Sequence, residues 1–124
     1  MSRVFTDPLV AAWSRAFAVT LLVELAVAAP LLGPAEPSRC RRAALVAIAN
    51  VASHPAVWFI FPALALGATT RLALSELWAV LLEVGVYRLA LRDLPALRAV
   101  AASALANGAS LGLGLLLRSA TGWV

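Results

Sequence analysis

Four apolar stretches, each close to the length that crosses a lipid bilayer, fill most of this chain; they cover about residues 8–32, 43–66, 71–91 and 96–117. The hydrocarbon core of a bilayer is ~30 Å thick, and a helix needs ~20 residues to cross it. Apolar residues make up 63% of the 124 residues and charged residues only 13%. Soluble domains contain about 45–50% apolar residues and about 25% charged residues. We therefore expect an all-α, polytopic membrane protein of four transmembrane helices, forming one membrane domain over residues 1–124.

The basic residues lie mostly at the ends of the apolar stretches. Ten of them, all Arg, stand against six acidic residues and give a net charge of +4. Arginines in such positions contact lipid headgroups. No basic face with interleaved aromatic residues is present, as a nucleic-acid-binding surface would need. We therefore expect the lipid bilayer, and no nucleic acid, as the partner of these arginines.

The first apolar stretch has a defined start. Asp7-Pro8 predicts a helix N-terminus, with Asp as the cap and Pro at the first helical position. A secretory signal peptide is the competing interpretation, because Val27-Ala28-Ala29 resembles a cleavage site. Glu24 within the apolar region favours a mature helix. Aromatic residues expected at the membrane interface are Trp13, Trp78 and Trp123.

The distribution of arginines predicts a topology. With four crossings, both termini lie on one side of the membrane. The loops around residues 33–42 and 88–98 hold six Arg, and the other side, which includes Arg3, holds four. The positive-inside rule places loops 33–42 and 92–97 in the cytoplasm. We expect a bacterial inner-membrane protein, and the margin of six to four leaves a dual topology open.

An internal repeat is the most informative feature of the sequence. Residues 41–53 read RRAALVAIANVAS and residues 98–110 read RAVAASALANGAS. Glu24 precedes Asn50 by 26 residues, and Glu83 precedes Asn107 by 24. These matches predict two tandem helical hairpins, over about residues 8–66 and 71–118, related by an axis along the membrane normal.

The repeated polar residues are predicted to share one depth. Glu24 and Glu83 each lie nine residues before the following loop, and Asn50 and Asn107 lie eight or nine residues after the preceding arginine. At ~1.5 Å rise per residue, all four side chains sit roughly 12–14 Å below the same surface. Charged groups at such depth normally face the bundle and pair, so we expect Glu24 and Glu83 to pair with Asn50, Asn107 and His54.

Further polar residues share the helix faces of these four. His54 lies four residues after Asn50, and an imidazole can carry a proton or bind a metal. Pro55 prevents a helical bond to the carbonyl of Val51, which leaves that oxygen for another donor or a cation. Leu111 replaces His54 in the second repeat, so the site is expected to be asymmetric. The supporting polar residues are Ser53, Ser110, Tyr87 and Thr20.

These patterns predict a small transporter or channel for a cation or protons. Carboxylate and amide oxygens with one imidazole suit protons, Na⁺ or a divalent ion. The expected ion- or proton-binding residues are Glu24, Glu83, Asn50, Asn107 and His54, and a metal would be held by His54, Glu24 and Glu83.

Two other functions compete with transport. In a non-catalytic assembly or anchoring subunit, the polar layer would serve only as interhelical packing. A membrane enzyme ranks third, because the sequence has no Walker-type loop, GxGxxG, CxxC or Ser/His/Asp set. No catalytic residue is assigned, and a bound cation is the one expected cofactor.

The small size of the chain predicts an oligomer. A bundle of 124 residues encloses little volume, so we expect a homo-oligomer, with a dimer favoured. Ala104, Gly108 and Gly112, each four residues apart, allow close helix approach within the chain or between protomers. A different membrane protein as partner is the alternative.

Overall fold

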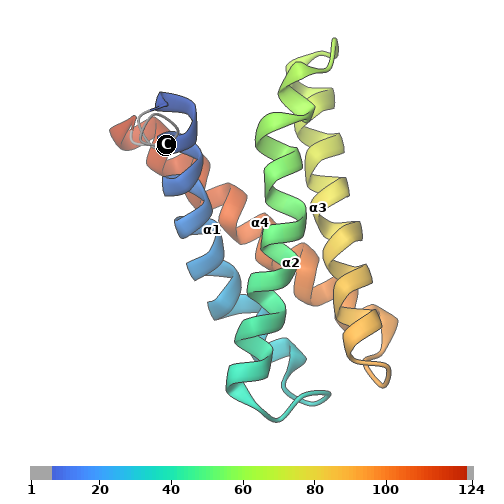
Figure 1. The fold of residues 1–124 in the computed structure, drawn as a ribbon. Helices are drawn as coiled ribbons and strands as arrows, with labels where there is room; N and C mark the ends of the chain where they lie inside the picture. Colours follow the sequence, from blue (N-terminus) through green and yellow to red (C-terminus); the bar gives the residue numbers. More distant parts are fainter. Residues whose placement is uncertain (1–6, 123–124) are drawn as a thin grey trace.

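The chain forms four long helices joined by short turns (Figure 1). The computed structural model describes residues 7–122, and Arg3 and Trp123 lie outside this range. No strand occurs among the described residues. The elements are α1 (Pro8–Leu32), α2 (Arg39–Phe59), the 3₁₀ turn η2 (Phe61–Ala63), α3 (Ala68–Ala90) and α4 (Ala96–Thr121). The all-helical prediction is confirmed.

The ends of α1 and α2 follow from local chemistry. Asp7 caps α1 as predicted, because its carboxylate accepts a hydrogen bond from the backbone N–H of Leu9 at 2.8 Å. Ser38 caps α2 in the same way and starts it at Arg39, four residues earlier than predicted. The prediction that the second helix continues to residue 66 is wrong, since Pro62 has no N–H to donate.

Three of the helices are long and apolar enough to cross a membrane: α1, α2 together with η2, and α4. The third helix, α3, has 23 residues but also carries four charged side chains. These are Arg71, Glu76, Glu83 and Arg88.

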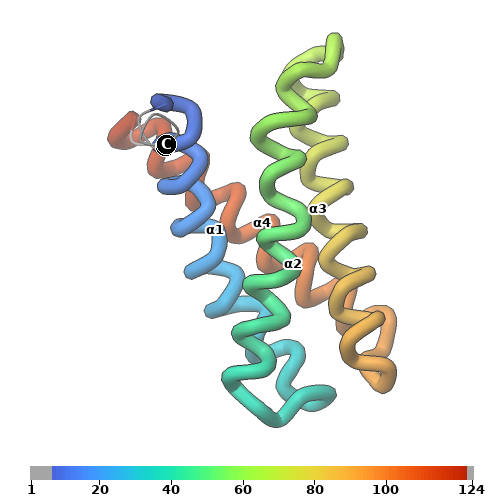
Figure 2. The backbone as a smooth tube through the Cα atoms, viewed as in Figure 1, coloured from blue at the N-terminus to red at the C-terminus, as the bar shows by residue number. Residues whose placement is uncertain are grey.

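The four helices form two pairs that diverge toward one end. Figures 1 and 2 show α1 beside α4 and α2 beside α3, with the chain reversing direction at each turn. The pairs meet near the turns at residues 33–38 and 91–95, and separate toward the end that holds residue 7, η2 and residue 122. Within residues 7–122, no Cα atom of α1 lies within 8 Å of one in α3, and none of α2 lies within 8 Å of one in α4. The bundle is therefore closed at one end and open at the other.

Small side chains make the closed end narrow. Five alanines in this half are fully buried, and small residues allow helix backbones to approach closely. They are Ala28, Ala49, Ala99, Ala102 and Ala106. Leu32, Leu94 and Tyr87 are also fully buried in this half. Other large apolar side chains lie on the outside of the bundle, among them Leu22, Ile48, Leu81, Leu97, Leu105 and Leu116.

A close fit between Gly33 and Arg42 joins α1 to α2 at the closed end. Arg42 Nη1 donates a hydrogen bond to the carbonyl oxygen of Ala29 in the last turn of α1, at 3.0 Å. The backbone at Gly33 is helical, so any residue fits its conformation. A Cβ at this position, however, would lie 2.8 Å from Arg42 Nη1.

Gly33→Ala is therefore expected to lower the free energy of unfolding by about 1 kcal/mol, because the displaced guanidinium loses a charged hydrogen bond to the helix end. Gly85→Ala is the control, since a Cβ there meets no atom within 4 Å and Ala favours a helix. Thermal unfolding in detergent, followed by circular dichroism, measures both. Equal melting temperatures for the two variants would contradict the proposed fit.

Candidate functional site

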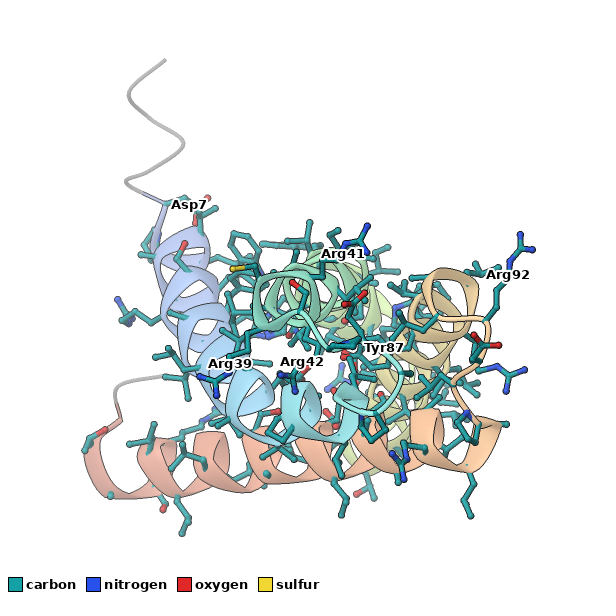
Figure 3. The ribbon with its side chains drawn as sticks, turned by 90° about the horizontal axis from the view of Figure 1, so that it is seen from below. Asp7, Arg39, Arg41, Arg42, Tyr87 and Arg92 are labelled. Carbon is teal, nitrogen blue, oxygen red and sulfur yellow. The ribbon has the colours of Figure 1, made fainter. Side chains whose placement is uncertain are left out.

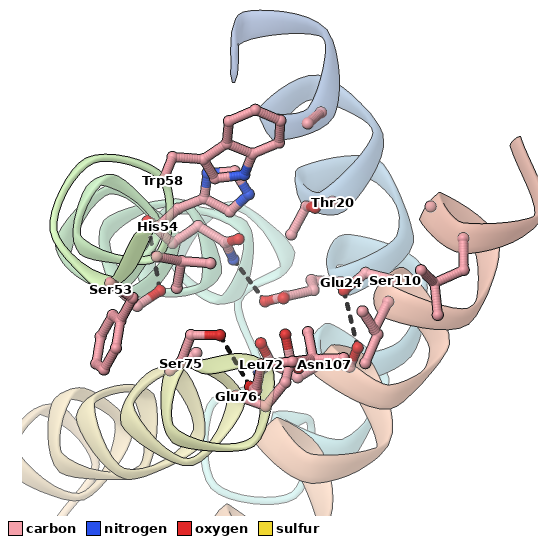
Figure 4. Close-up of a pocket in the computed structure, with 18 of the residues that line it drawn as sticks. Thr20, Glu24, Ser53, His54, Trp58, Leu72, Ser75, Glu76, Asn107 and Ser110 are labelled. Atoms are coloured by element: carbon pink, nitrogen blue, oxygen red, sulfur yellow. Dashed lines mark hydrogen bonds between the residues drawn. The ribbon is translucent and has the colours of Figure 1, made fainter. Parts of the chain in front are cut away.

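The open half of the bundle contains a cavity of about 450 Å³. Residues from α1, α2, η2, α3 and α4 line it, and Figure 4 shows labelled side chains from the four long helices around a common space. Glu24, Asn50, Glu83 and Asn107, near the middle of their helices, form its deep end. Phe61, Arg71 and Arg118 lie toward the end of the bundle where the helix pairs separate.

The first carboxylate–amide pair joins α1 to α2. Asn50 Nδ2 donates to Glu24 Oε2 at 2.6 Å and to the carbonyl oxygen of Val46 at 3.0 Å. Both side chains are fully buried. Among residues 7–122, Glu24 Oε1 and Asn50 Oδ1 have no hydrogen-bond partner. Two acceptor atoms are therefore buried and unsatisfied beside the cavity.

The second pair joins α3 to α4 with the same bond. Asn107 Nδ2 donates to Glu83 Oε2 at 2.6 Å and to the carbonyl oxygen of Ser103 at 3.0 Å. This carboxylate has two further donors: Ser103 Oγ donates to Oε2 at 2.7 Å, and Ser53 Oγ donates to Oε1 at 3.1 Å. Both carboxylate oxygens of Glu83 therefore accept hydrogen bonds, whereas Glu24 accepts one at Oε2 and has a free Oε1.

The structure thus brings together each predicted Glu with its predicted Asn. Ser53 connects the pairs, because it belongs to α2 and bonds to Glu83 on α3. Ser110 lines the cavity and donates to the carbonyl oxygen of Asn107 at 3.0 Å.

Ser103 was not among the predicted site residues. It lies four residues before Asn107 on the same helix face, and this spacing was the signal for its role.

His54 does not pair with a carboxylate. Its Nδ1 accepts a hydrogen bond from Trp13 Nε1 on α1 at 3.0 Å, and this places the proton of a neutral imidazole on Nε2. Phe17 packs against the ring edge-on, with centroids 5.3 Å apart, and Trp58 stacks on it at 6.3 Å. The predicted pairing of His54 with the glutamates is therefore corrected, and Trp13 bonds inside the bundle.

The remaining predicted residues lie around this layer. Thr20 lines the cavity one turn from Glu24. Tyr87 is fully buried one turn from Glu83, on the closed side, and its hydroxyl has no hydrogen-bond partner. Glu76 also lines the cavity. Arg88 donates to the carbonyl oxygen of Leu94 at 3.1 Å.

The described part of the chain contains no group of three or more His, Cys, Asp or Glu side chains arranged to hold a metal ion. The predicted metal set of His54, Glu24 and Glu83 is not assembled in it. One contributing reason is the hydrogen bond that holds the His54 ring against Trp13.

No protein family, curated protein or solved structure matches this chain.

The unequal partners of the two carboxylates predict unequal effects on stability. Glu83→Leu removes the acceptor of three side-chain donors, whereas Glu24→Leu removes the acceptor of one. We expect Glu83→Leu to lower the free energy of unfolding by about 1–2 kcal/mol more than Glu24→Leu does. Denaturation of the purified protein in mixed micelles measures the difference. A larger loss for Glu24→Leu would contradict this assignment of roles.

Proposed function

We propose that this chain is an integral membrane protein of four transmembrane helices that carries or conducts a cation or protons. Glu24 is its charged centre. The observation that carries the proposal is the pair of unpartnered buried oxygens, Glu24 Oε1 and Asn50 Oδ1, at the deep end of a cavity. A membrane-buried charge costs at least ~2.5–3.5 kcal/mol on insertion scales, so a free carboxylate oxygen at this depth calls for a proton or a cation.

The distribution of apolar and charged side chains supports the membrane proposal. Large apolar residues cover the outside of the bundle, where soluble proteins rarely expose large contiguous patches. The charges of α3 also have an explanation. Arg71, Glu76 and Glu83 line the cavity, and Arg88 lies near the end of the helix. We therefore include α3 as the fourth span.

The matched hydrogen bonds support the proposed duplication. In each hairpin an Asn amide donates to a Glu carboxylate at 2.6 Å and to the carbonyl four residues earlier at 3.0 Å. Two independent helical hairpins would have little reason to share this pattern. We propose parallel repeats, over about residues 8–66 and 71–118, whose carboxylates meet in one layer.

The arginines support a topology with the closed end in the cytoplasm of a bacterial cell. Figure 3 views the molecule from the closed end and shows Arg39, Arg41, Arg42 and Arg92 there. Under the positive-inside rule, the turns at this end face the cytoplasm of an inner-membrane protein. The cavity then opens toward the opposite face of the membrane.

The two carboxylates have different parts in the proposed mechanism. Glu83 accepts three hydrogen bonds and holds α2, α3 and α4 in place. Glu24 accepts one side-chain bond and keeps one oxygen free, so a proton or cation can arrive and leave without breaking the bundle. His54, fixed by Trp13, lines the cavity and is the candidate relay.

A second candidate function is a non-catalytic assembly or anchoring subunit. The fully satisfied Glu83 favours it, because its three bonds are what interhelical packing requires. The free oxygens at Glu24 and Asn50 favour transport instead, since packing usually pairs buried acceptors and these two lie together on residues that line the cavity.

We also propose a homodimer. The reason is the exposed surface of α4, not the volume of the bundle. One chain encloses about 450 Å³, so the volume does not require a partner. The stripe of Ala104, Gly108 and Gly112, however, is exposed on the outer face of α4, and a Cβ at either glycine meets no atom within 4 Å. A second copy, or another membrane protein, can approach closely along this face.

Flux measurements on protein reconstituted in liposomes test the transport proposal. Glu24→Gln keeps an acceptor for Asn50 but removes the charge, and it is expected to reduce proton or cation flux at least tenfold without loss of folding. Glu36→Gln, in the turn between α1 and α2, is the control and should keep normal flux. A Glu24→Gln/Glu83→Gln double variant with normal flux, or a wild-type protein with none, would contradict transport.

A further inference from the structure

The cavity is larger than a bare ion needs. A water molecule occupies about 30 Å³ in the liquid, whereas the cavity measures about 450 Å³. Sites for small organic molecules typically measure about 300–1,000 Å³ and combine apolar walls with a few polar groups. The volume therefore corresponds to a small organic molecule.

The charges along the cavity favour a cation at its deep end. Glu24, Glu83 and, nearer the mouth, Glu76 contribute carboxylates. The cationic side chains that line it, Arg71 and Arg118, lie toward the open end of the bundle, and Arg71 donates to the carbonyl oxygen of Pro62 at 3.3 Å. A ligand with its positive group inward would meet carboxylates first, whereas an anionic ligand would be repelled at that depth.

The two unpartnered oxygens specify the kind of cation. Glu24 Oε1 and Asn50 Oδ1 only accept hydrogen bonds, and both are buried without a donor. An alkylammonium group supplies three N–H donors and a positive charge. A metal ion would need more ligands than these two, and the described residues assemble no three-residue metal cluster. Aromatic walls suit the rest of such a ligand, because Trp58 and Phe61 line the same cavity.

We propose that the cavity binds an organic primary ammonium compound, with its –NH₃⁺ group bonded to Glu24 Oε1 and Asn50 Oδ1 and its apolar part against Trp58 and Leu111. This inference rests on the proposed function in one respect, because it takes Glu24 as the centre that binds the cation. It adds the chemical class of the ligand and the atoms that recognise it.

Calorimetry on the purified protein, with three matched probes, tests the ligand class. The probes are 2-phenylethylammonium, the neutral 2-phenylethanol and the trimethylated 2-phenylethylammonium, which has the charge but no N–H donor. We expect 2-phenylethylammonium to bind at least tenfold more tightly than either analogue. Equal binding of the trimethylated compound would overturn the role of the two oxygens, and absence of ammonium binding would overturn the proposal.

Variants locate the site. Glu24→Gln is expected to weaken ammonium binding at least tenfold, and Trp58→Leu about two- to tenfold. Gly114→Leu places a large side chain in the cavity, since Gly114 lines it and a Cβ there meets no atom within 4 Å, and it should abolish binding. Gly85→Leu, on α3 outside the cavity, should bind normally. Normal binding by Gly114→Leu would place the ligand elsewhere and overturn the proposal.

The same variants separate this inference from the proposed function. Proton or inorganic-cation flux that depends on Glu24, without any ammonium binding, would leave transport standing and reject the organic ligand. Loss of both the flux and the ammonium binding would reject the transport proposal and the organic ligand together. Ammonium binding without inorganic flux would support the ligand class and reject proton or inorganic-cation transport.

Discussion

Two short hydrogen bonds from asparagine amides to glutamate carboxylates determine how this bundle is arranged. Each measures 2.6 Å and joins the two helices of one hairpin at mid-length. Within a membrane, buried polar groups must find partners in the protein, so these bonds fix which helix faces turn inward. The alanines on the closed side let the backbones approach closely there, and the open side retains a cavity above the polar layer.

The two hairpins share this Glu–Asn hydrogen bond and differ in the side chains around it. In the second half, Ser103 and Ser53 complete the coordination of Glu83. In the first half, Val46 stands four residues before Asn50, as Ser103 does before Asn107, so Glu24 receives a single side-chain donor. Four residues after the asparagine stands His54 in the first half, where it stacks on Trp58, and Leu111 in the second. One carboxylate thus bonds to three side chains across the bundle, while Glu24 keeps one buried oxygen without a partner among residues 7–122.

The sequence predicted the helices and the Glu–Asn pairs because scarce polar residues recur at matching distances within long apolar stretches. It could not predict that Ser53 bonds to Glu83 on another helix, because the rotation of α2 against α3 depends on the packing of their apolar side chains. The bond between Trp13 and His54 was missed for a similar reason: a Trp near a helix end predicts an interfacial position equally well. The early end of α2 shows how strongly Pro62 acts against an otherwise continuous apolar pattern.

If the cavity opens toward one face of the membrane as proposed, water enters it through the open end of the bundle, and thiol labelling measures this access. In a Cys40→Ser background, which removes the exposed native thiol, cysteines replace Thr20 and Gly114 in the cavity or Leu81 and Leu105 on the outer face. A membrane-impermeant, thiol-reactive reagent is added to the reconstituted protein. We predict that Thr20→Cys and Gly114→Cys react and that Leu81→Cys and Leu105→Cys do not. Protection of both cavity positions would contradict this access, provided that the reagent reaches both membrane faces and that Cys40 of the wild-type protein, the positive control, reacts.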